Sequence, residues 1–525
     1  MEELHLLLVA EGLAPALRWP AHLAGMLSLA SDMEVYPLSI IGHDRVIHFL
    51  AKSPYDQHLG LAYDAHHAPS AAAELHGNAD AYELEGVRVA VKLCPRSHAN
   101  ALALRKRIPF LVPQSVGLAT SVGLGDRLGL ATPGHVRAVR GSGLRAVLAQ
   151  QSIREMSRTG RSPEQVLDDA MWGAMQEGFR DGFGADADHL KTLEDVTACA
   201  AAGFVMFTID PGAHVDDAAD GATGSQLAEK FAALPWEALE ASPTDCRAAY
   251  LGKKLAVAAG LTLEPSEEDV LRAAAKYGAA IAHTARLYRH LASLRGDQPF
   301  EMEMSVDETE SPTSPFEHYF VASELRRLGV RWVSLAPRFV GRFEKGVDYQ
   351  GDLGEFERSF AQHAAIARAL GPYKLSIHSG SDKFSIYPIA ARLAGDLVHV
   401  KTAGTSYLVA LWAIASVAPE MFREILDFAC EHYEADKASY HVSADLAKVP
   451  RTAHHKDAEL PALLEQFDTR EVLHVTYGSV LNARRTDGSW QFRERLLETL
   501  RQNEEVYLRA LERHLARHIE PFRKG

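Results

Sequence analysis

Between about residue 115 and residue 405 the chain alternates short apolar segments with helix-like segments eight times. Each apolar segment has the length of a strand and is followed by a turn or a helix start signal. Ser162-Pro163-Glu164 opens one such helix, because serine caps a helix and proline suits its first position. Eight βα units of this kind predict an α/β fold, a closed TIM-type (β/α)8 barrel rather than an open sheet.

The expected barrel strands share high apolar content and a length of five to seven residues. They are residues 121–125, 146–152, 187–191, 204–209, 300–305, 331–335, 374–378 and 397–401.

The pattern divides the chain into three regions. Residues 1–112 predict a small α/β cap region with strands at 34–41, 46–50 and 86–93. Residues 113–405 form the barrel, interrupted by a helical insertion at about 212–296. Residues 406–525 are expected to form a helical extension. Within it, the helical spacing of Leu, Glu and Arg over residues 491–517 predicts one amphipathic helix.

Several barrel strands carry ionisable side chains at or near their ends, where an apolar core would exclude them. Desolvating such groups is costly unless they are paired or bound. Because the carboxyl ends of parallel barrel strands meet at one mouth, these residues predict an active site there. They are His189, Lys191, Asp210, Glu301, Glu303, His378, His399 and Lys401.

Glu303, His378 and His399 are the predicted metal ligands. Two imidazoles on neighbouring strands with a carboxylate suit one divalent ion, and Zn, Mn, Fe, Co and Ni stay open. The alternative for His399 is a structural group near the barrel end. Glu301 is expected to pair with a lysine or arginine inside the barrel.

Asp210, His189 and Lys191 are the candidate catalytic groups that move protons. Asp210 precedes Pro211-Gly212, so a turn-forming role competes with a catalytic one. Lys191 could also act through a Schiff base in place of a metal.

The candidate substrate-binding residues follow the same strand ends. Arg127 and Arg338 are suited to hold a carboxylate through two hydrogen bonds, and surface ion pairs are the alternative. The full set is Asp126, Arg127, Gln150, Arg338, Ser379, Asp382 and Lys401. The glycines of the 123–129 segment lack the GxGxxG spacing, so no nucleotide is expected.

Charge and composition narrow the class of protein. With 55 basic and 69 acidic residues the formal charge is −14, which argues against nucleic acid as a partner. The four cysteines form no CxxC pair, the first residues lack a basic leader, and no apolar run is long enough to span a membrane. We expect a cytoplasmic enzyme with a small-molecule substrate, and a homo-oligomer is compatible with the sequence.

Three long segments together resemble the tagaturonate/fructuronate epimerase family. They are Ser121-Val122-Gly123-Leu124-Gly125-Asp126-Arg127-Leu128-Gly129 with Thr132-Pro133-Gly134-His135, then Gly184-Ala185-Asp186-Ala187-Asp188-His189-Leu190-Lys191-Thr192, and Phe207-Thr208-Ile209-Asp210-Pro211. The similarity extends from about residue 113 through the last helix. It implies a metal-dependent TIM barrel of hexuronate catabolism that interconverts two ketouronates. Some relatives are similar enough to act on fructose and tagatose, which differ at C4.

The chemistry of that reaction favours retro-aldol cleavage and re-addition. The inverted carbon is β to the ketone, so the carbonyl does not acidify its hydrogen. Bond cleavage needs a Lewis acid at the ketone and a base for the hydroxyl. Transient oxidation by bound NAD is the other route to inversion, and no dinucleotide motif supports it.

Two other classes of function stay open at this point. One is a metal-dependent aldolase or a sugar isomerase on the same barrel, which product analysis would separate. The other is a sugar-binding protein without turnover. The number of ionisable groups expected at one place argues against it, because binding alone rarely needs so many.

Overall fold

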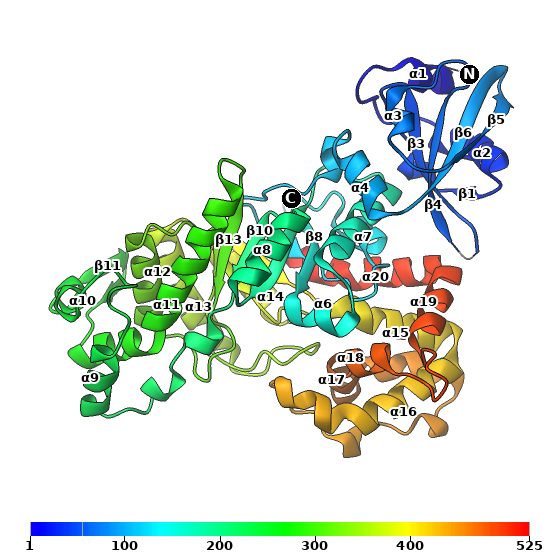
Figure 1. Ribbon diagram of the computed structural model, residues 1–525. Coiled ribbons are helices and arrows are strands. Elements are labelled where there is room, and N and C mark those ends of the chain that lie inside the picture. The colour runs from blue at the N-terminus through cyan, green and yellow to red at the C-terminus, as the bar shows by residue number, and fades with distance from the viewer. Residues whose placement is uncertain (1, 55, 524–525) are drawn as a thin grey trace.

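Eight parallel strands close into a barrel in the computed structural model, which describes residues 2–54 and 56–523 (Figure 1). The TIM-type fold expected from the sequence is thereby confirmed. The order around the barrel is β7, β8, β9, β10, β13, β14, β15 and β16, and β16 pairs with β7 to close it. Their bounds are β7 Ser121–Gly123, β8 Arg145–Ser152, β9 Gly184–Leu190, β10 Met206–Ile209, β13 Glu301–Ser305, β14 Ser334–Ala336, β15 Lys374–Ile377 and β16 Val398–Lys401.

Helices follow the strands and cover the outside of the barrel. They are α5 (Thr132–Val139), α6 (Ile153–Thr159), α7 (Pro163–Gln176), α8 (Leu193–Ala202), α11 (Glu267–Arg295), α12 (Pro315–Arg327), α13 (Leu353–Leu370) and α14 (Tyr387–Ala394). Capping boxes begin several of them. In α7 the Ser162 hydroxyl accepts a hydrogen bond from the backbone N–H of Gln165, and the Gln165 side chain accepts one from the backbone N–H of Ser162. These start signals are local, which is why the sequence pattern located the helices.

The segment between β10 and β13 is mostly helical and ends in the barrel-covering helix α11. It comprises α9 (Gly224–Ala232), α10 (Pro243–Tyr250), a hairpin of β11 (Leu255–Ala258) and β12 (Leu261–Leu263), and α11. Figure 1 shows this green segment at the side of the barrel opposite the blue N-terminal sheet.

The N-terminal region is an antiparallel sheet with its own core. Its strands are β1 (Glu34–Val35), β2 (Ile41–His43), β3 (Val46–Lys52), β4 (Gln57–Asp64), β5 (Asn78–Leu84) and β6 (Val87–Pro95), covered by α1 (Glu2–Val9) and α2 (Pro20–Ser31), with α3 (Ser70–Ala73) and α4 (His98–Arg105) beside them. The predicted continuous strand at 34–41 is wrong, because a 3-10 turn at Pro37–Ser39 separates β1 from β2. Proline lacks the N–H that a continuous strand would use there.

The C-terminal extension consists of helices that pack on the barrel. They are α15 (Thr405–Val417), α16 (Pro419–Asp436), α17 (Phe467–Val475), α18 (Tyr477–Asn482), α19 (Arg493–Gln502) and α20 (Glu504–Ile519). The predicted single helix at 491–517 is two helices, because Asn503 leaves the helical conformation between α19 and α20. Its side-chain amide donates to the carbonyl of Thr499 at 2.9 Å, which helps to end α19. α20 packs against α5 and α15, which joins the extension to the barrel.

Candidate active site

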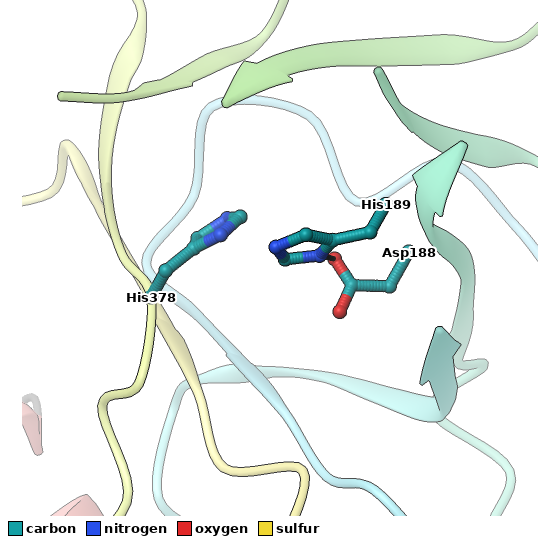
Figure 2. A group of neighbouring side chains, drawn as sticks. All are labelled: Asp188, His189 and His378. Carbon is teal, nitrogen blue, oxygen red and sulfur yellow. Dashed lines mark ion pairs between the residues drawn. The ribbon is translucent and has the colours of Figure 1, made fainter. Parts of the chain in front are cut away.

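The carboxyl ends of the barrel strands carry a compact cluster of ionisable side chains. Asp188 and His189 come from the end of β9, and His378 follows β15 and points toward them from the other side (Figure 2). The potential ligand atoms of these three residues lie within 4.8 Å of one another, and the two imidazole centroids are 5.0 Å apart. The cluster therefore lies where parallel barrels place their reactive groups.

A bulge in β9 explains why Asp188 and His189 both reach this cluster. Phe207 of β10 pairs with Ala187, but Ile209 pairs with Leu190, so β9 holds one extra residue. His189 has a φ of +54°, a left-handed conformation that residues other than glycine rarely adopt. Such bulges redirect side chains beside active sites. Strict alternation would have sent Asp188 and His189 to opposite faces, and the bulge places them side by side.

Carboxylates hold both ring nitrogens of His378. Its Nε2 is 2.5 Å from Oε1 of Glu303, and its Nδ1 is 3.2 Å from Oδ1 of Asp307. Burial lowers the pKa of His378, but Asp307 and Glu303 raise it overall. The same Asp307 oxygen is 3.7 Å from Nε2 of His189, so one carboxylate lies near both imidazoles.

The ammonium of Lys401 is the counter-ion of three buried carboxylates beside the cluster. Its Nζ is 2.8 Å from Asp186, 2.7 Å from Asp188 and 2.9 Å from Glu303. It also donates to Oγ1 of Thr208 at 2.7 Å. Burial lowers the pKa of Lys401, but the carboxylates outweigh burial and raise it well above its usual range. Lys401 therefore stays charged and ties β9, β13 and β16 together.

His399 and Glu301 lie one layer deeper in the barrel than Lys401 and Glu303. Residues two apart on a strand are separated by about 7 Å along it. His399 Nδ1 is 2.8 Å from the hydroxyl of Ser121, and burial lowers the pKa of His399 to about 3, so the ring is neutral. Of the three predicted ligands, the structure brings Glu303 and His378 into contact and places His399 apart from the cluster.

Two adjoining cavities give access to the cluster, and we call them together the barrel-mouth cavity. One measures about 420 Å³ and the other about 50 Å³, and both are lined by Lys345, His378, Ser379 and Tyr440. Lys345 Nζ is 2.5 Å from the hydroxyl of Ser379, and its nearest ion-pair partner, Glu308, is 3.9 Å away. Volumes of this order suit a small molecule, and Lys345 offers it a weakly compensated positive charge.

The donor set of the cluster fits a divalent transition metal. Neither of the two buried ring nitrogens of His189 has a well-formed hydrogen bond among the described residues, although Asp188 lies 2.9 Å from Nδ1. Two imidazoles and a carboxylate are ligands that Zn, Mn, Fe, Co and Ni accept. Asp188, His189 and His378 are therefore residues that could hold a metal.

Comparison with known proteins gives a consistent result. A sequence model of the UxaE family, described as tagaturonate epimerase, matches residues 36–522. The chain belongs to the tagaturonate epimerase family. It is thus an isomerase of the carbohydrate epimerase class.

Individual relatives cover most of the chain. The chain is 50% identical over 427 residues to a tagaturonate/fructuronate epimerase of Thermotoga maritima, a match that covers 81% of this chain and 85% of the relative. A crystal structure of the fructuronate-tagaturonate epimerase of Cohnella laeviribosi with one glycerol superposes with a TM-score of 0.88 at 38% identity, covering 96% of this chain and 99% of that one. The native crystal structure of the same protein gives 0.87 at 39% identity with the same coverage.

Four of the predicted substrate-binding residues of this family member line the inner part of the barrel-mouth cavity. They are Arg127, Gln150, Ser379 and Lys401. Arg127 is already engaged, because its Nε donates to Glu155 at 2.8 Å and its guanidinium stacks on Tyr477 at 3.7 Å. Gln150 donates to Asp188 at 2.9 Å and so orients one residue of the cluster.

The remaining three predicted substrate-binding residues differ in position. Arg338 lines the wider part of the barrel-mouth cavity, and its guanidinium donates to the carbonyl of Thr309. Asp126 accepts from the backbone N–H groups of residues 128, 129 and 131 at 2.7–3.0 Å, which fixes the turn after β7. Asp382 is 2.9 Å from Arg470 and 2.5 Å from His514, so it joins the C-terminal helices to the barrel.

Asp210 and Lys191 form an ion pair at the rim of the cluster. Lys191 Nζ is 3.1 Å from Oδ2 of Asp210, and the Lys191 side chain is 56% exposed. The other Asp210 oxygen accepts from the N–H of Gly212 at 2.9 Å, as the turn-forming alternative expected. A ligand atom of Asp210 also lies within 4.8 Å of those of His189 and Glu308. The structure therefore combines the turn-forming role with a position near the imidazole.

Five residues of the site were not among the sequence-based candidates. They are Arg154, Asp186, Asp188, Asp307 and Lys345. A signal was present for Asp186 and Asp188, because a barrel strand with two buried acidic residues requires a partner. No comparable signal marks Lys345, which lies in the long segment between β14 and α13.

No helix within residues 2–54 and 56–523 is both long enough and apolar enough to cross a bilayer.

Proposed function

We propose that this chain interconverts D-tagaturonate and D-fructuronate, using the cluster at the barrel mouth and one divalent metal ion. The observation that carries the proposal is the cluster of Asp188, His189 and His378 beside a small cavity, in a chain that belongs to the tagaturonate epimerase family. D-Fructose and D-tagatose, which differ in the same way, are candidate secondary substrates.

Asp188, His189 and His378 are the residues that would hold the metal. Of the sequence-based set only His378 remains. His399 is left out because it lies with Ser121 in a deeper layer, and Glu303 because Lys401 and His378 already engage its carboxylate. A bound divalent ion would supply Lewis acidity at the ketone end of the substrate. Lys401 supports this arrangement, since it compensates the negative charge of Asp188 and Glu303.

The chain's own residues account for the proton transfers of a retro-aldol route. A carboxylate oxygen of Asp210 accepts the proton of the hydroxyl on the inverting carbon. The bond between that carbon and its neighbour next to the ketone then breaks, its electrons pass to an enediolate, and the inverting carbon becomes an aldehyde. The aldehyde turns, the bond reforms on its other face, and Asp210 returns the proton. The ammonium of Lys191 lies 3.1 Å from Oδ2 of Asp210, beside the group assigned this role.

Product analysis tests the proposed activity directly. Purified protein supplied with a divalent metal is incubated separately with D-tagaturonate, D-fructuronate and D-fructose, and the products are separated by chromatography. We expect each uronate to yield the other from either direction. Accumulation of shorter fragments would indicate an aldolase, an aldose product would indicate a keto–aldo isomerase, and saturable binding without turnover would indicate a binding protein.

Isotope retention tests the retro-aldol route. The hydrogen on the inverting carbon never leaves it on this route, so deuterium placed there is expected to be fully retained. Reaction in heavy water is expected to add no deuterium at that carbon, as NMR of the product would show. Solvent deuterium at the inverted carbon would contradict the route and indicate direct deprotonation. Full retention with a primary isotope effect would instead indicate a hidden oxidation.

Substitution of Lys345 tests how a substrate carboxylate is held. Arg127 and Lys401 are paired with buried carboxylates. Arg338 donates to a backbone carbonyl. Among the described residues, Lys345 donates only to the hydroxyl of Ser379 and has its nearest carboxylate at 3.9 Å. We expect Lys345→Gln to lower kcat/KM for the uronates about tenfold or more, because a charged hydrogen bond contributes roughly 1.5–3 kcal/mol. The loss on D-fructose should be small.

The matched control for that prediction is Arg342→Gln, which removes one charge from the same cavity at a side chain that is 64% exposed. This substitution should lower kcat/KM only slightly, and to the same extent for the uronates and for D-fructose. Equal losses on both substrate classes in Lys345→Gln would exclude Lys345 as the carboxylate-binding group.

A further inference from the structure

A second cavity, which we call the junction cavity, lies where three parts of the chain meet. It measures about 510 Å³ and is lined by residues of the N-terminal sheet, of α7 and the turn after β7, and of α19. Four arginines line it, namely Arg96, Arg161, Arg493 and Arg501. It shares no lining residue with the barrel-mouth cavity.

The acidic residues of the junction cavity do not balance these arginines. Asp169 is paired with Arg161 at 2.6 Å, and Asp168 with Arg105 at 2.7 Å. The third acidic residue, Asp56, is 71% exposed and lies 3.8 Å from a histidine. Asp168 and Asp169 are therefore already engaged by arginines, and Asp56 is mostly exposed to solvent.

Arg96, Arg493 and Arg501 are left without a carboxylate partner among the described residues. Arg96 donates to the side-chain amide of Gln57, and Arg493 donates to the carbonyl of Thr159 at 2.6 Å, which are both neutral acceptors. Burial lowers the pKa of Arg96; the nearby Asp169 opposes this effect, and Arg501 adds to it. Three guanidinium groups thus face one cavity without an ion pair to a carboxylate among the described residues, in a protein whose formal charge is −14.

Unsatisfied donors point to the same kind of ligand. Nε of Arg96 and Nε1 of Trp172 are buried and have no acceptor among the described residues. Both residues line the junction cavity, and Trp172 is only 1% exposed. Buried donors without acceptors are costly, so the cavity is suited to a ligand rich in acceptor oxygens.

We propose that the junction cavity binds a phosphate-bearing small molecule. Guanidinium groups match phosphate oxygens in geometry and charge. Three of them suit a phosphate dianion better than they suit a ligand with a single carboxylate. The volume of the cavity accommodates a sugar phosphate. The site goes beyond the proposed epimerase activity, whose substrates carry a carboxylate and no phosphate.

The junction cavity and the barrel-mouth cavity lie close together, so a binding experiment needs a control variant in each. Leu128, Gly129 and Leu130 line the junction cavity, whereas the adjacent Arg127 lines the barrel-mouth cavity. An anionic probe could therefore reach either place. Lys345→Gln alters only the barrel-mouth cavity, and Arg501→Gln alters only the junction cavity.

Calorimetric titration of the full chain with glucose 6-phosphate tests the proposal, with glucose and citrate as reference probes. We expect saturable binding of glucose 6-phosphate and none of glucose. Arg501→Gln and Arg493→Gln should each weaken binding about tenfold, because each removes a charged contact. Lys345→Gln should leave it unchanged.

Arg495→Gln is the matched control on the same helix. It removes an equal charge from α19, but Arg495 pairs with Glu424 at 2.8 Å and does not line the cavity. Its binding of glucose 6-phosphate should equal that of the parent protein. The absence of saturable binding, equal weakening in Arg495→Gln, loss of binding in Lys345→Gln, or equal affinity for citrate would each overturn the proposal.

Discussion

His378→Ala is expected to reduce kcat/KM for both uronates on the order of a thousandfold and to lower the metal content of the purified protein. The imidazole contacts Glu303 on one side and Asp307 on the other, and its ring faces His189. Losing a metal ligand removes several kcal/mol of transition-state stabilisation. Elemental analysis and initial rates on the same samples would measure both effects. A chelator should abolish turnover in the parent protein, and a divalent metal should restore it.

His399→Ala separates the two possible ligand sets. If Asp188, His189 and His378 hold the metal, this variant should keep its metal, because His399 contacts Ser121. Loss of metal in His399→Ala would instead support the set based on strand position. His432→Ala, on α16, controls for the removal of an imidazole elsewhere. Full activity in a preparation shown to be free of metal would contradict the metal-dependent proposal altogether.

Lys401→Met is expected to be strongly destabilising as well as inactive. The substitution leaves Asp186, Asp188 and Glu303 buried without their shared counter-ion. Removing one partner of a buried ion pair typically costs about 3–5 kcal/mol. The free energy of unfolding, measured by urea denaturation at neutral pH, should fall by an amount of this order.

Lys374→Met is the matched control, since it removes another buried lysine from the barrel interior. Lys374 donates to the hydroxyl of Ser121 at 2.9 Å, and burial lowers its pKa to about 8. With no ion pair within the described residues to lose, its replacement should cost clearly less. Equal losses of unfolding free energy in the two variants would show that Lys401 acts only through packing. Adding Asp186→Asn to Lys401→Met should recover part of the loss.

The sequence located the strands of the barrel well because the signals for them are local. The strand predicted at 146–152 is β8, Arg145–Ser152, and the one predicted at 300–305 is β13, Glu301–Ser305. Apolar runs of this length between capped helices leave few other folds. The polar strand ends also predicted where the site lies, because buried charges need partners wherever they occur.

Which residues make up the site could not be predicted from the alternation of side chains along each strand. One extra residue in β9 places Asp188 beside His189. No glycine or other typical bulge residue stands at the left-handed position, so the sequence did not predict the bulge. His378 follows the end of β15, whereas His399 lies within β16, two residues before its end, and is therefore in a deeper layer.

The sequence by itself determined that this chain forms a barrel of eight βα units with ionisable groups at its mouth, since periodicity, caps and charge position act over a few residues. Only the tertiary structure decided which of these groups meet. Lys345 comes from a long loop, Tyr440 from the C-terminal extension, and the three carboxylates around Lys401 from two strands. Contacts between segments hundreds of residues apart depend on packing and register. Those are set by the whole fold rather than by any local pattern.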